Sequence, residues 1–335
     1  MTGHTAHTIL HKKYDILKMK IVYFGSGEFG VECLNALAGS NHNLMFVVTQ
    51  PPLPAGRGRK PRPTPVARWA KEHSLEFLEA DNVNAPASIE KIAAFAADLI
   101  VVIAFGQKIG SELINLPPKS AINVHASLLP KYRGAAPINW AIINGETETG
   151  ISIIKLAEEM DAGDILAREK TEIFPDETAG QLHDRLARMA PPLLLKTIDK
   201  IADDTVVYTK QDHSKATLAP KLKKLDALLD FSEPARSLQR KILGFYPWPG
   251  TTAVYFSNKT KKNQRVTIAA AEVVETPKQA GLANGVLDEN LNVVCGEEAL
   301  KITRIKPDGS ALMDFKDFVN GRATAPGDMF MKIEK

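Results

Sequence analysis

The chain has 335 residues, of which 44% are hydrophobic and 24% are charged. This length exceeds one ordinary domain, and the composition excludes wholesale disorder while supplying enough apolar residues for a core. No apolar stretch reaches the roughly 18 residues that a membrane-spanning helix requires, so we expect no membrane span.

The first 18 residues are expected to be a disordered extension. They contain no apolar run, no arginine and no small-residue cleavage site, so they make a poor signal or transit peptide. The two cysteines, Cys33 and Cys295, lie far apart and form no CxxC pair. We therefore expect a reducing compartment, and a cytoplasmic protein.

Residues 19–208 are predicted to alternate between β-strands and α-helices. The predicted strands are short, apolar and rich in β-branched residues, and they span 20–24, 43–49, 98–105 and 120–125. Stretches with helical periodicity separate them, at 29–37, 65–73 and 88–96. This pattern is typical of a doubly wound, mostly parallel, Rossmann-like α/β sheet. Such sheets bind ligands at the carboxyl ends of their strands.

The composition and patterning of the sequence change after residue 208. A polar, lysine-rich linker (209–230) precedes a predicted helix at 234–243, and short strand-like runs follow, at 251–256, 265–274, 285–289, 291–295 and 299–306. Residues 231–335 are therefore predicted to form a small OB-like β-barrel.

The formal charge is divided unevenly between the two halves. Residues 209–335 carry 20 basic and 15 acidic side chains, whereas residues 1–208 carry 22 and 24. A basic carboxyl-terminal half is compatible with a polyanionic partner and equally with a solvated surface.

A glycine-rich turn follows the first predicted strand. Residues 25–30 read GSGEFG, the spacing of a dinucleotide-binding fingerprint. That fingerprint also requires an acidic residue at the end of the second strand, where this chain has Val48, Thr49 and Gln50. We therefore favour a packing role for these glycines over NAD binding.

Candidate catalytic residues lie at two predicted strand edges. Asn123 and His125 are two residues apart in one strand, so they face the same side. A carboxamide beside an imidazole can stabilise an oxyanion that develops on a carbonyl, although such pairs are more often ordinary hydrogen-bonded neighbours. Asp161 begins a glycine-containing turn between two further strand-like runs.

The stretch NVHASLLPKYRGAAPINWAIINGETETG (123–150), followed by MDAGDIL, resembles the formyltetrahydrofolate-dependent formyltransferases. The resemblance implies a catalytic trio of Asn123, His125 and Asp161. It also implies 10-formyltetrahydrofolate as co-substrate, without a metal, and a folate-binding segment made of Ser127, Leu128, Leu129 and Pro130. In the implied mechanism Asn123 and His125 stabilise the oxyanion, and Asp161 favours the charged imidazole.

Two further segments indicate which molecule accepts the formyl group. TQPPLPAGRGRK (49–60) resembles the loop by which methionyl-tRNA formyltransferases grip initiator tRNA, and FYPWPG (245–250) resembles their F-N-P-W-P-G element with Tyr246 in place of asparagine. The resemblance implies initiator methionyl-tRNA as partner, and we expect the protein to be a monomer. The expected tRNA contacts are Arg57, Arg59, Lys60 and Arg62.

Alternative functions remain open at this point. Sugar-nucleotide formyltransferases resemble the chain around SLLPKYRG and NGETETG, and a formyltetrahydrofolate hydrolase would use the same folate chemistry. A third possibility is a binding module in which the α/β fold and the basic barrel hold RNA without catalysis.

Overall fold

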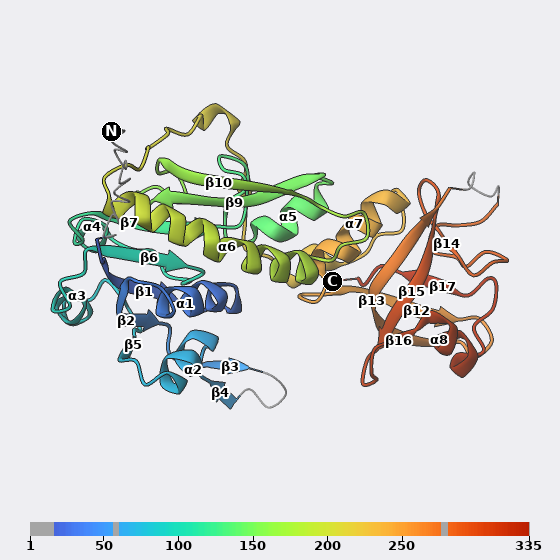
Figure 1. The fold of residues 1–335 in the computed structure, drawn as a ribbon. Coiled ribbons are helices and arrows are strands. Elements are labelled where there is room, and N and C mark those ends of the chain that lie inside the picture. The colour runs from blue at the N-terminus through green and yellow to red at the C-terminus, as the bar shows by residue number, and fades with distance from the viewer. Residues whose placement is uncertain (1–16, 56–59, 276–280, 335) are drawn as a thin grey trace, which may run out of the picture.

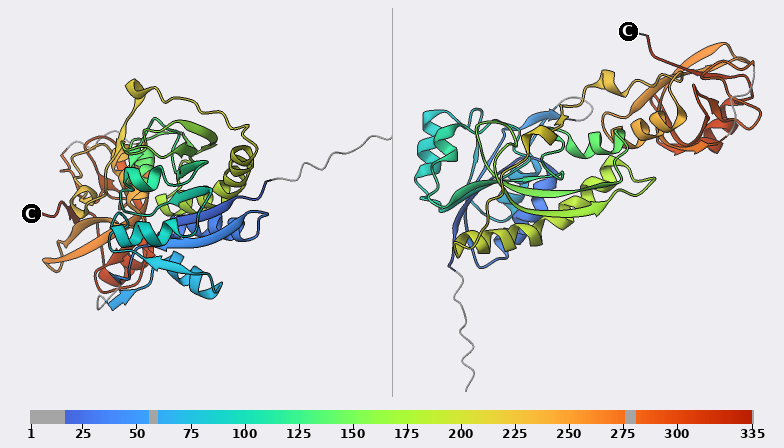
Figure 2. Two further views of the ribbon diagram at one scale, coloured as in Figure 1. Left: turned by 90° about the vertical axis from the view of Figure 1, so that its left-hand side faces the viewer. Right: turned by 90° about the horizontal axis from the view of Figure 1, so that it is seen from above.

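The computed structural model describes residues 17–55, 60–275 and 281–334 (Figure 1). The predictions for residues 1–16 lie outside this range. The described residues form an α/β unit and an antiparallel barrel, which lie side by side in Figure 1 and in the right-hand view of Figure 2. No helix among them is long and apolar enough to cross a membrane.

A seven-stranded sheet forms the centre of the first unit, in the order β10-β9-β7-β6-β1-β2-β5. Five neighbouring strands are parallel, namely β5 (Phe77–Glu79), β2 (Asn43–Thr49), β1 (Lys20–Gly25), β6 (Leu99–Ile103) and β7 (Ser120–His125). An antiparallel pair completes the sheet, β9 (Glu148–Lys155) and β10 (Ile165–Glu172). The predicted doubly wound, mostly parallel sheet is therefore confirmed.

Helices cover both faces of this sheet because its strands are apolar on both sides. Alternate residues of β1 enter different cores, with Ile21 and Tyr23 in one, and Val22 and Phe24 in the other. The first core includes residues of α1 (Val31–Ala38), α2 (Pro65–Glu72) and α6 (Ala179–Ala202), and the second includes residues of α3 (Pro86–Ala93) and α4 (Ser111–Ile114).

The α6 helix, 24 residues long, was not among the predicted elements. Thr178 caps its first turn, since the threonine hydroxyl accepts from the Gln181 backbone N–H and the Gln181 side chain accepts from the Thr178 N–H. Pro191 and Pro192 lie inside the helix and disguise it in the sequence. Burial of its apolar face, including Leu186 and Leu194, maintains the helix across them.

The second unit is a nearly closed antiparallel barrel, which confirms the predicted OB-like barrel. Its strands are β12 (Thr251–Ser257), β13 (Lys262–Val274), β14 (Val293–Val294), β15 (Ala299–Pro307), β16 (Met313–Asp314) and β17 (Met329–Met331). The predicted strand at 285–289 is wrong, because that segment makes only isolated bridges through Val286 and Leu287. The helix α8 (Phe315–Arg322) and the strands β16 and β17 had no counterpart in the prediction.

The segment between the two units follows the α/β unit closely. Thr209 forms a bridge with Ile165, and β11 (Leu218–Ala219) pairs in parallel with β8 (Arg133–Gly134). Two 3-10 turns, η2 (His213–Lys215) and η3 (Lys224–Ala227), complete it. This segment is therefore an ordered edge of the first unit as well as a connection.

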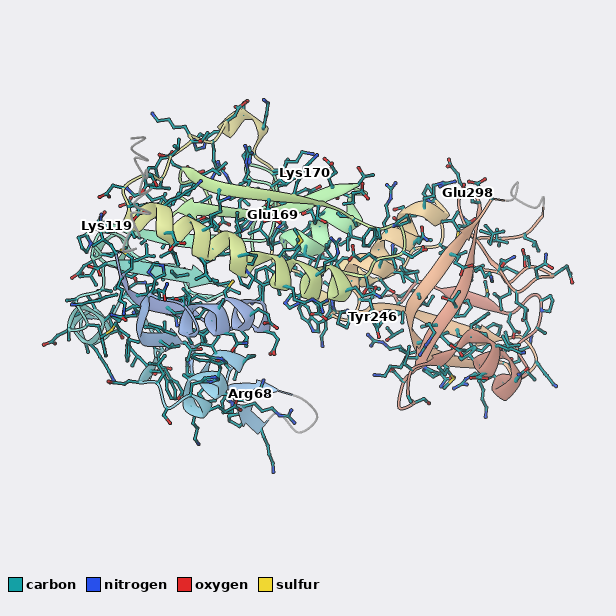
Figure 3. The ribbon with its side chains drawn as sticks, in the orientation of Figure 1. Arg68, Lys119, Glu169, Lys170, Tyr246 and Glu298 are labelled. Carbon is teal, nitrogen blue, oxygen red and sulfur yellow. The ribbon has the colours of Figure 1, made fainter. Side chains whose placement is uncertain are left out.

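The helix α7 (Ala235–Phe245) joins the barrel to the α/β unit. It packs against α5 (Pro137–Ile143), and the Asn139 side-chain amide donates a 2.7 Å hydrogen bond to the Gly244 carbonyl. Figure 3 shows Tyr246 at this junction, where its carbonyl accepts from the Gly180 N–H at 3.1 Å.

Candidate functional site

Three polar side chains meet at the carboxyl end of β7. The Asn123 amide donates to Asp161 Oδ1 at 3.3 Å, and His125 Nδ1 lies 3.6 Å from Asp161 Oδ2. Asn123 and His125 share one face of β7, while Asp161 lies in the turn between β9 and β10. His125 is 6% exposed and the Asp161 side chain is 12% exposed, so the group is largely shielded from water.

The backbone around Asp161 fixes the position of its carboxylate. Asp161 has a positive φ of 52°, and its Oδ2 accepts a 2.9 Å hydrogen bond from the Gly134 N–H. Gly134 itself has φ 121° and lies so close to the Ala219 carbonyl that a Cβ would stand 2.7 Å from that oxygen. Only glycine fits this position, so the donor to Asp161 is fixed by the local backbone.

The hydrogen bonding of His125 determines its tautomer. His125 Nε2 lies 2.9 Å from the Tyr132 carbonyl oxygen, which can only accept, so Nε2 carries a hydrogen. Nδ1 is therefore the ring nitrogen that faces Asp161. Tyr132 supplies that carbonyl with φ 62°, and its phenol donates to Glu146 at 2.8 Å. Burial raises the pKa of Tyr132 to about 12, so the phenol remains a donor.

The predicted folate-binding segment lies beside this group. The Ser127 and Leu129 side chains are fully buried, and Ser152 holds the segment by accepting from the Leu129 N–H at 3.0 Å and donating to the Ser127 carbonyl at 2.7 Å. Leu128 and Pro130 are half-buried and retain exposed surface. The structure therefore leaves only the second pair with side-chain surface for a ligand.

Backbone donors of the glycine-rich turn at 25–30 are used within the protein. The N–H groups of Ser26 and Gly27 both donate to the Ala104 carbonyl at 3.2 Å, whereas a dinucleotide site would offer such groups to phosphate. A Cβ on Gly25 or on Gly30 would collide with the Tyr23 ring or hydroxyl. These glycines therefore allow Tyr23 to pack beneath the turn.

The predicted tRNA-binding loop begins and ends at a buried contact between two threonines. Thr49 and Thr64 share a 2.7 Å hydrogen bond between their hydroxyls. Between them β3 (Leu53–Ala55) and β4 (Lys60–Arg62) pair as a hairpin. Lys60 and Arg62 are exposed on β4, and Figure 3 shows Arg68 of α2 beside the hairpin. The other two predicted contacts, Arg57 and Arg59, lie outside the described residues.

Two buried polar residues near the site were missed from the sequence. Arg133 and Gln211 are 5% and 6% exposed, and the Gln211 side-chain oxygen accepts from Arg133 Nη2 at 2.8 Å. The YRG sequence around Arg133 belonged to the quoted motif, but no pattern indicated its burial. Gln211 lies in a polar linker and gave no local signal.

The cysteines do not contribute to this site. Cys33 and Cys295 are both buried, and burial raises the pKa of each thiol to about 12. A protonated, enclosed thiol is a poor nucleophile. The amide, the imidazole and the carboxylate therefore remain as the candidate reactive groups of the site.

Comparison with known proteins gives matches along both units. A family model described as formyl transferase matches residues 19–198, and one described as formyl transferase, C-terminal domain, matches residues 221–323. Among solved structures, the sugar 3N-formyl transferase WlaRD superposes with a TM-score of 0.61 at 14% identity, covering 88% of this chain and 99% of that one. HypX from Aquifex aeolicus superposes with a TM-score of 0.59 at 15% identity, covering 95% of this chain and 51% of that one. At these identities the two structures show a shared fold.

Sequence relatives are much closer. The methionyl-tRNA formyltransferase of Citrifermentans bemidjiense is 38% identical over 317 residues, which are 94% of this chain and 97% of the relative. That of Solibacter usitatus is 39% identical over 305 residues, covering 91% and 96%. The likeness extends over both units and the segment between them. The chain therefore belongs to the methionyl-tRNA formyltransferase family.

Proposed function

We propose that this chain transfers the formyl group of 10-formyltetrahydrofolate to the α-amine of methionine on initiator tRNA, in the cytoplasm and as a monomer. The observation that carries the proposal is the meeting of Asn123, His125 and Asp161 at the carboxyl edge of the sheet. The relatives that match nearly the whole chain are named for the same acceptor.

The hydrogen-bond donors of the site fit the formyl amide of the folate co-substrate. Bound folate would supply a carbonyl carbon that is open to attack by an amine. One N–H of the Asn123 amide donates to Asp161, and the second is the donor that a developing oxyanion would use. Leu128 and Pro130 provide the exposed apolar surface beside it.

His125 and Asp161 would manage the protons of the reaction. Nε2 is engaged with the Tyr132 carbonyl, so Nδ1 is the nitrogen that would give a proton to the departing amine of the folate. Nδ1 would be reprotonated afterwards. The Asp161 carboxylate, 3.6 Å away, stabilises the charged imidazole and accepts the proton of the attacking amine, directly or through water.

The two units would divide the work. We assign residues 19–208 to catalysis, 209–230 to the linker and 231–335 to tRNA binding. The exposed residues Lys60 and Arg62, together with Arg57 and Arg59 of the same segment, would contact the acceptor end of the tRNA. Arginine binds phosphate bidentately and stacks on unpaired bases, which suits such a contact.

Measuring tetrahydrofolate release with three acceptors tests this function. Wild-type protein should release it rapidly with methionyl initiator tRNA, and slowly with an amino-sugar nucleotide or with water alone. Rapid release with the amino-sugar nucleotide would establish a sugar-nucleotide formyltransferase, and rapid release with water would establish a hydrolase. RNA binding without release under any condition would establish a binding module.

A further inference from the structure

Gln211 lies directly behind the turn that carries Asp161. Its side-chain Nε2 donates to the backbone carbonyl oxygens of Asp161 and Gly163, each at 2.7 Å. Its Oε1 accepts from Arg133 Nη2 at 2.8 Å and from Arg133 Nε at 3.3 Å. Both amide hydrogens and both lone pairs of the oxygen are therefore used.

These contacts leave the amide only one orientation. Exchanging its oxygen and nitrogen would turn the nitrogen toward the donors of Arg133 and the oxygen toward two carbonyl oxygens. Arg133 is itself held, because its Nη1 lies 3.1 Å from Glu159 Oε1 and its Nη2 lies 3.1 Å from His213 Nδ1. Since Gln211 and Arg133 are almost completely buried, water cannot replace these hydrogen bonds without rearrangement.

The Asp161 turn requires support of this kind. Asp161 is a non-glycine residue with a positive φ, a strained conformation that persists only where its surroundings hold it. Gly134 holds the carboxylate at one end, while Gln211 holds the carbonyls of Asp161 and Gly163 at the other. A turn released at its carbonyls could relax and move the carboxylate away from His125.

We propose that Gln211 is a positioning residue for formyl transfer, which holds the Asp161 carboxylate against His125 through the backbone of the turn. This inference rests on the proposed catalytic role of Asp161. Gln211 belongs to the segment between the two units, so that segment contributes to the geometry of the catalytic group.

Two substitutions and a control test the proposal. Gln211→Met removes every hydrogen bond at nearly constant volume, whereas Gln211→Glu keeps an acceptor for Arg133 and removes both donors to the turn. Each should lower kcat by about tenfold or more, because small displacements of catalytic groups are costly, while KM for the folate changes little. Ser214→Ala, on the same segment and hydrogen-bonded to Asp212, should leave both constants unchanged.

A double-mutant cycle separates positioning from general stability. In an Asp161→Asn background there is no carboxylate to position, so adding Gln211→Glu should cost less than threefold in single-turnover rate. All rates are measured below the onset of thermal unfolding of each variant. Independent, multiplicative losses would overturn the proposal, as would wild-type kcat in Gln211→Met and Gln211→Glu. Wild-type turnover in Asp161→Asn alone would instead overturn the catalytic assignment itself.

Discussion

A backbone carbonyl, rather than a side chain, determines which nitrogen of His125 carries a hydrogen and which nitrogen faces Asp161. Tyr132 presents that carbonyl from a left-handed conformation, and two residues later Gly134 presents the N–H that binds Asp161. One short loop thus orients both the imidazole and the carboxylate. Side-chain changes in Tyr132 should therefore affect the site less than changes in the loop backbone.

His125→Ala and Asp161→Asn should each reduce kcat by about 10²-fold or more, since each removes a general acid–base or its charged partner. Tetrahydrofolate affinity, measured by calorimetry, should change much less. Asp164→Asn is the matched control, because it removes the same charge from the same turn. Near-wild-type turnover in both active-site variants would remove the trio from the mechanism.

Gly30→Ala should destabilise the protein by about 1–3 kcal/mol, because the new methyl group collides with the Tyr23 hydroxyl. Urea unfolding measures this loss. Tyr23→Phe removes the colliding hydroxyl together with its 3.1 Å hydrogen bond to the Gly30 carbonyl, so Gly30→Ala should cost less in the Tyr23→Phe background than in wild type. An equal or larger cost in that background would contradict the packing role of this glycine.

The sequence indicated the residues that meet at the carboxyl end of β7 but not the residues that support them, for a physical reason. Asn123 and His125 are predictable as a pair because strand periodicity is local. Gln211 lies 50 residues from Asp161 and 78 from Arg133, so its role depends on tertiary contacts. Polar residues in a connector are ordinarily solvated, and the Gln211 environment becomes visible only when the fold buries it.

At the scale of elements, the hairpin β3–β4 is an exposed feature that follows the carboxyl end of β2. The Thr49–Thr64 hydrogen bond closes its base, and α2 begins directly after it. Its exposed basic side chains, Lys60 and Arg62, therefore lie on a hairpin whose two ends are joined by a buried hydrogen bond. This arrangement suits contact with a large polyanion better than contact with a small ligand.

Replacing Arg57, Arg59, Lys60 and Arg62 together by alanine should weaken kcat/KM for charged tRNA and make its salt dependence shallower, because fewer counterions are released. Arg57→Ala alone should cost about 1–3 kcal/mol in transition-state binding if the contact is specific. Tetrahydrofolate affinity should not change.

Lys119→Ala provides the control for this experiment. Lys119 precedes β7 at the opposite edge of the sheet and pairs with Asp204 at 2.7 Å. An exposed pair of this kind contributes little stability, so its loss should leave the salt slope of tRNA formylation unchanged. An unchanged slope in the quadruple variant would contradict the role of the hairpin.

Elements were predictable where their patterns were regular and short. The strands β1, β2 and β7 match their predicted ranges closely, because each is a continuous apolar run between turn residues. Pro191 and Pro192 obscured the helix α6 in the sequence. The composition of 285–289 favoured a strand, but this segment forms only isolated bridges. In both cases tertiary packing decided the outcome against local propensity.

At the scale of the whole molecule, the contact between α5 and α7 links the two units. Gly244 allows this close approach, since a Cβ there would stand 2.5 Å from Ile143 Cγ1 and 3.1 Å from the Asn139 carbonyl. The close approach of α7 to α5, one of the contacts that orient the barrel, therefore requires glycine at position 244.

Gly244→Ala should destabilise the protein by about 1–3 kcal/mol through overpacking at this contact. KM for charged tRNA should rise, while folate affinity stays constant because none of the atoms that the new methyl group would meet belongs to the predicted folate-binding segment. Thermal unfolding and steady-state kinetics measure the two effects. Gly321→Ala in α8 is the control, since a Cβ there meets no described atom within 4 Å, and it should be neutral or slightly stabilising.

The pairing of β8 with β11 has a consequence for recombination between relatives. A crossover placed at residue 208 would exchange Gln211, Thr217 and β11 together with the barrel. The loop that contains β8 would then come from one parent, and β11, the strand that pairs with it, from the other. A crossover between Pro220 and Asp230 keeps these partners together. Chimeras joined there keep the predicted catalytic group and the hairpin of one parent with the barrel of the other, and they should retain more turnover than chimeras joined at 208.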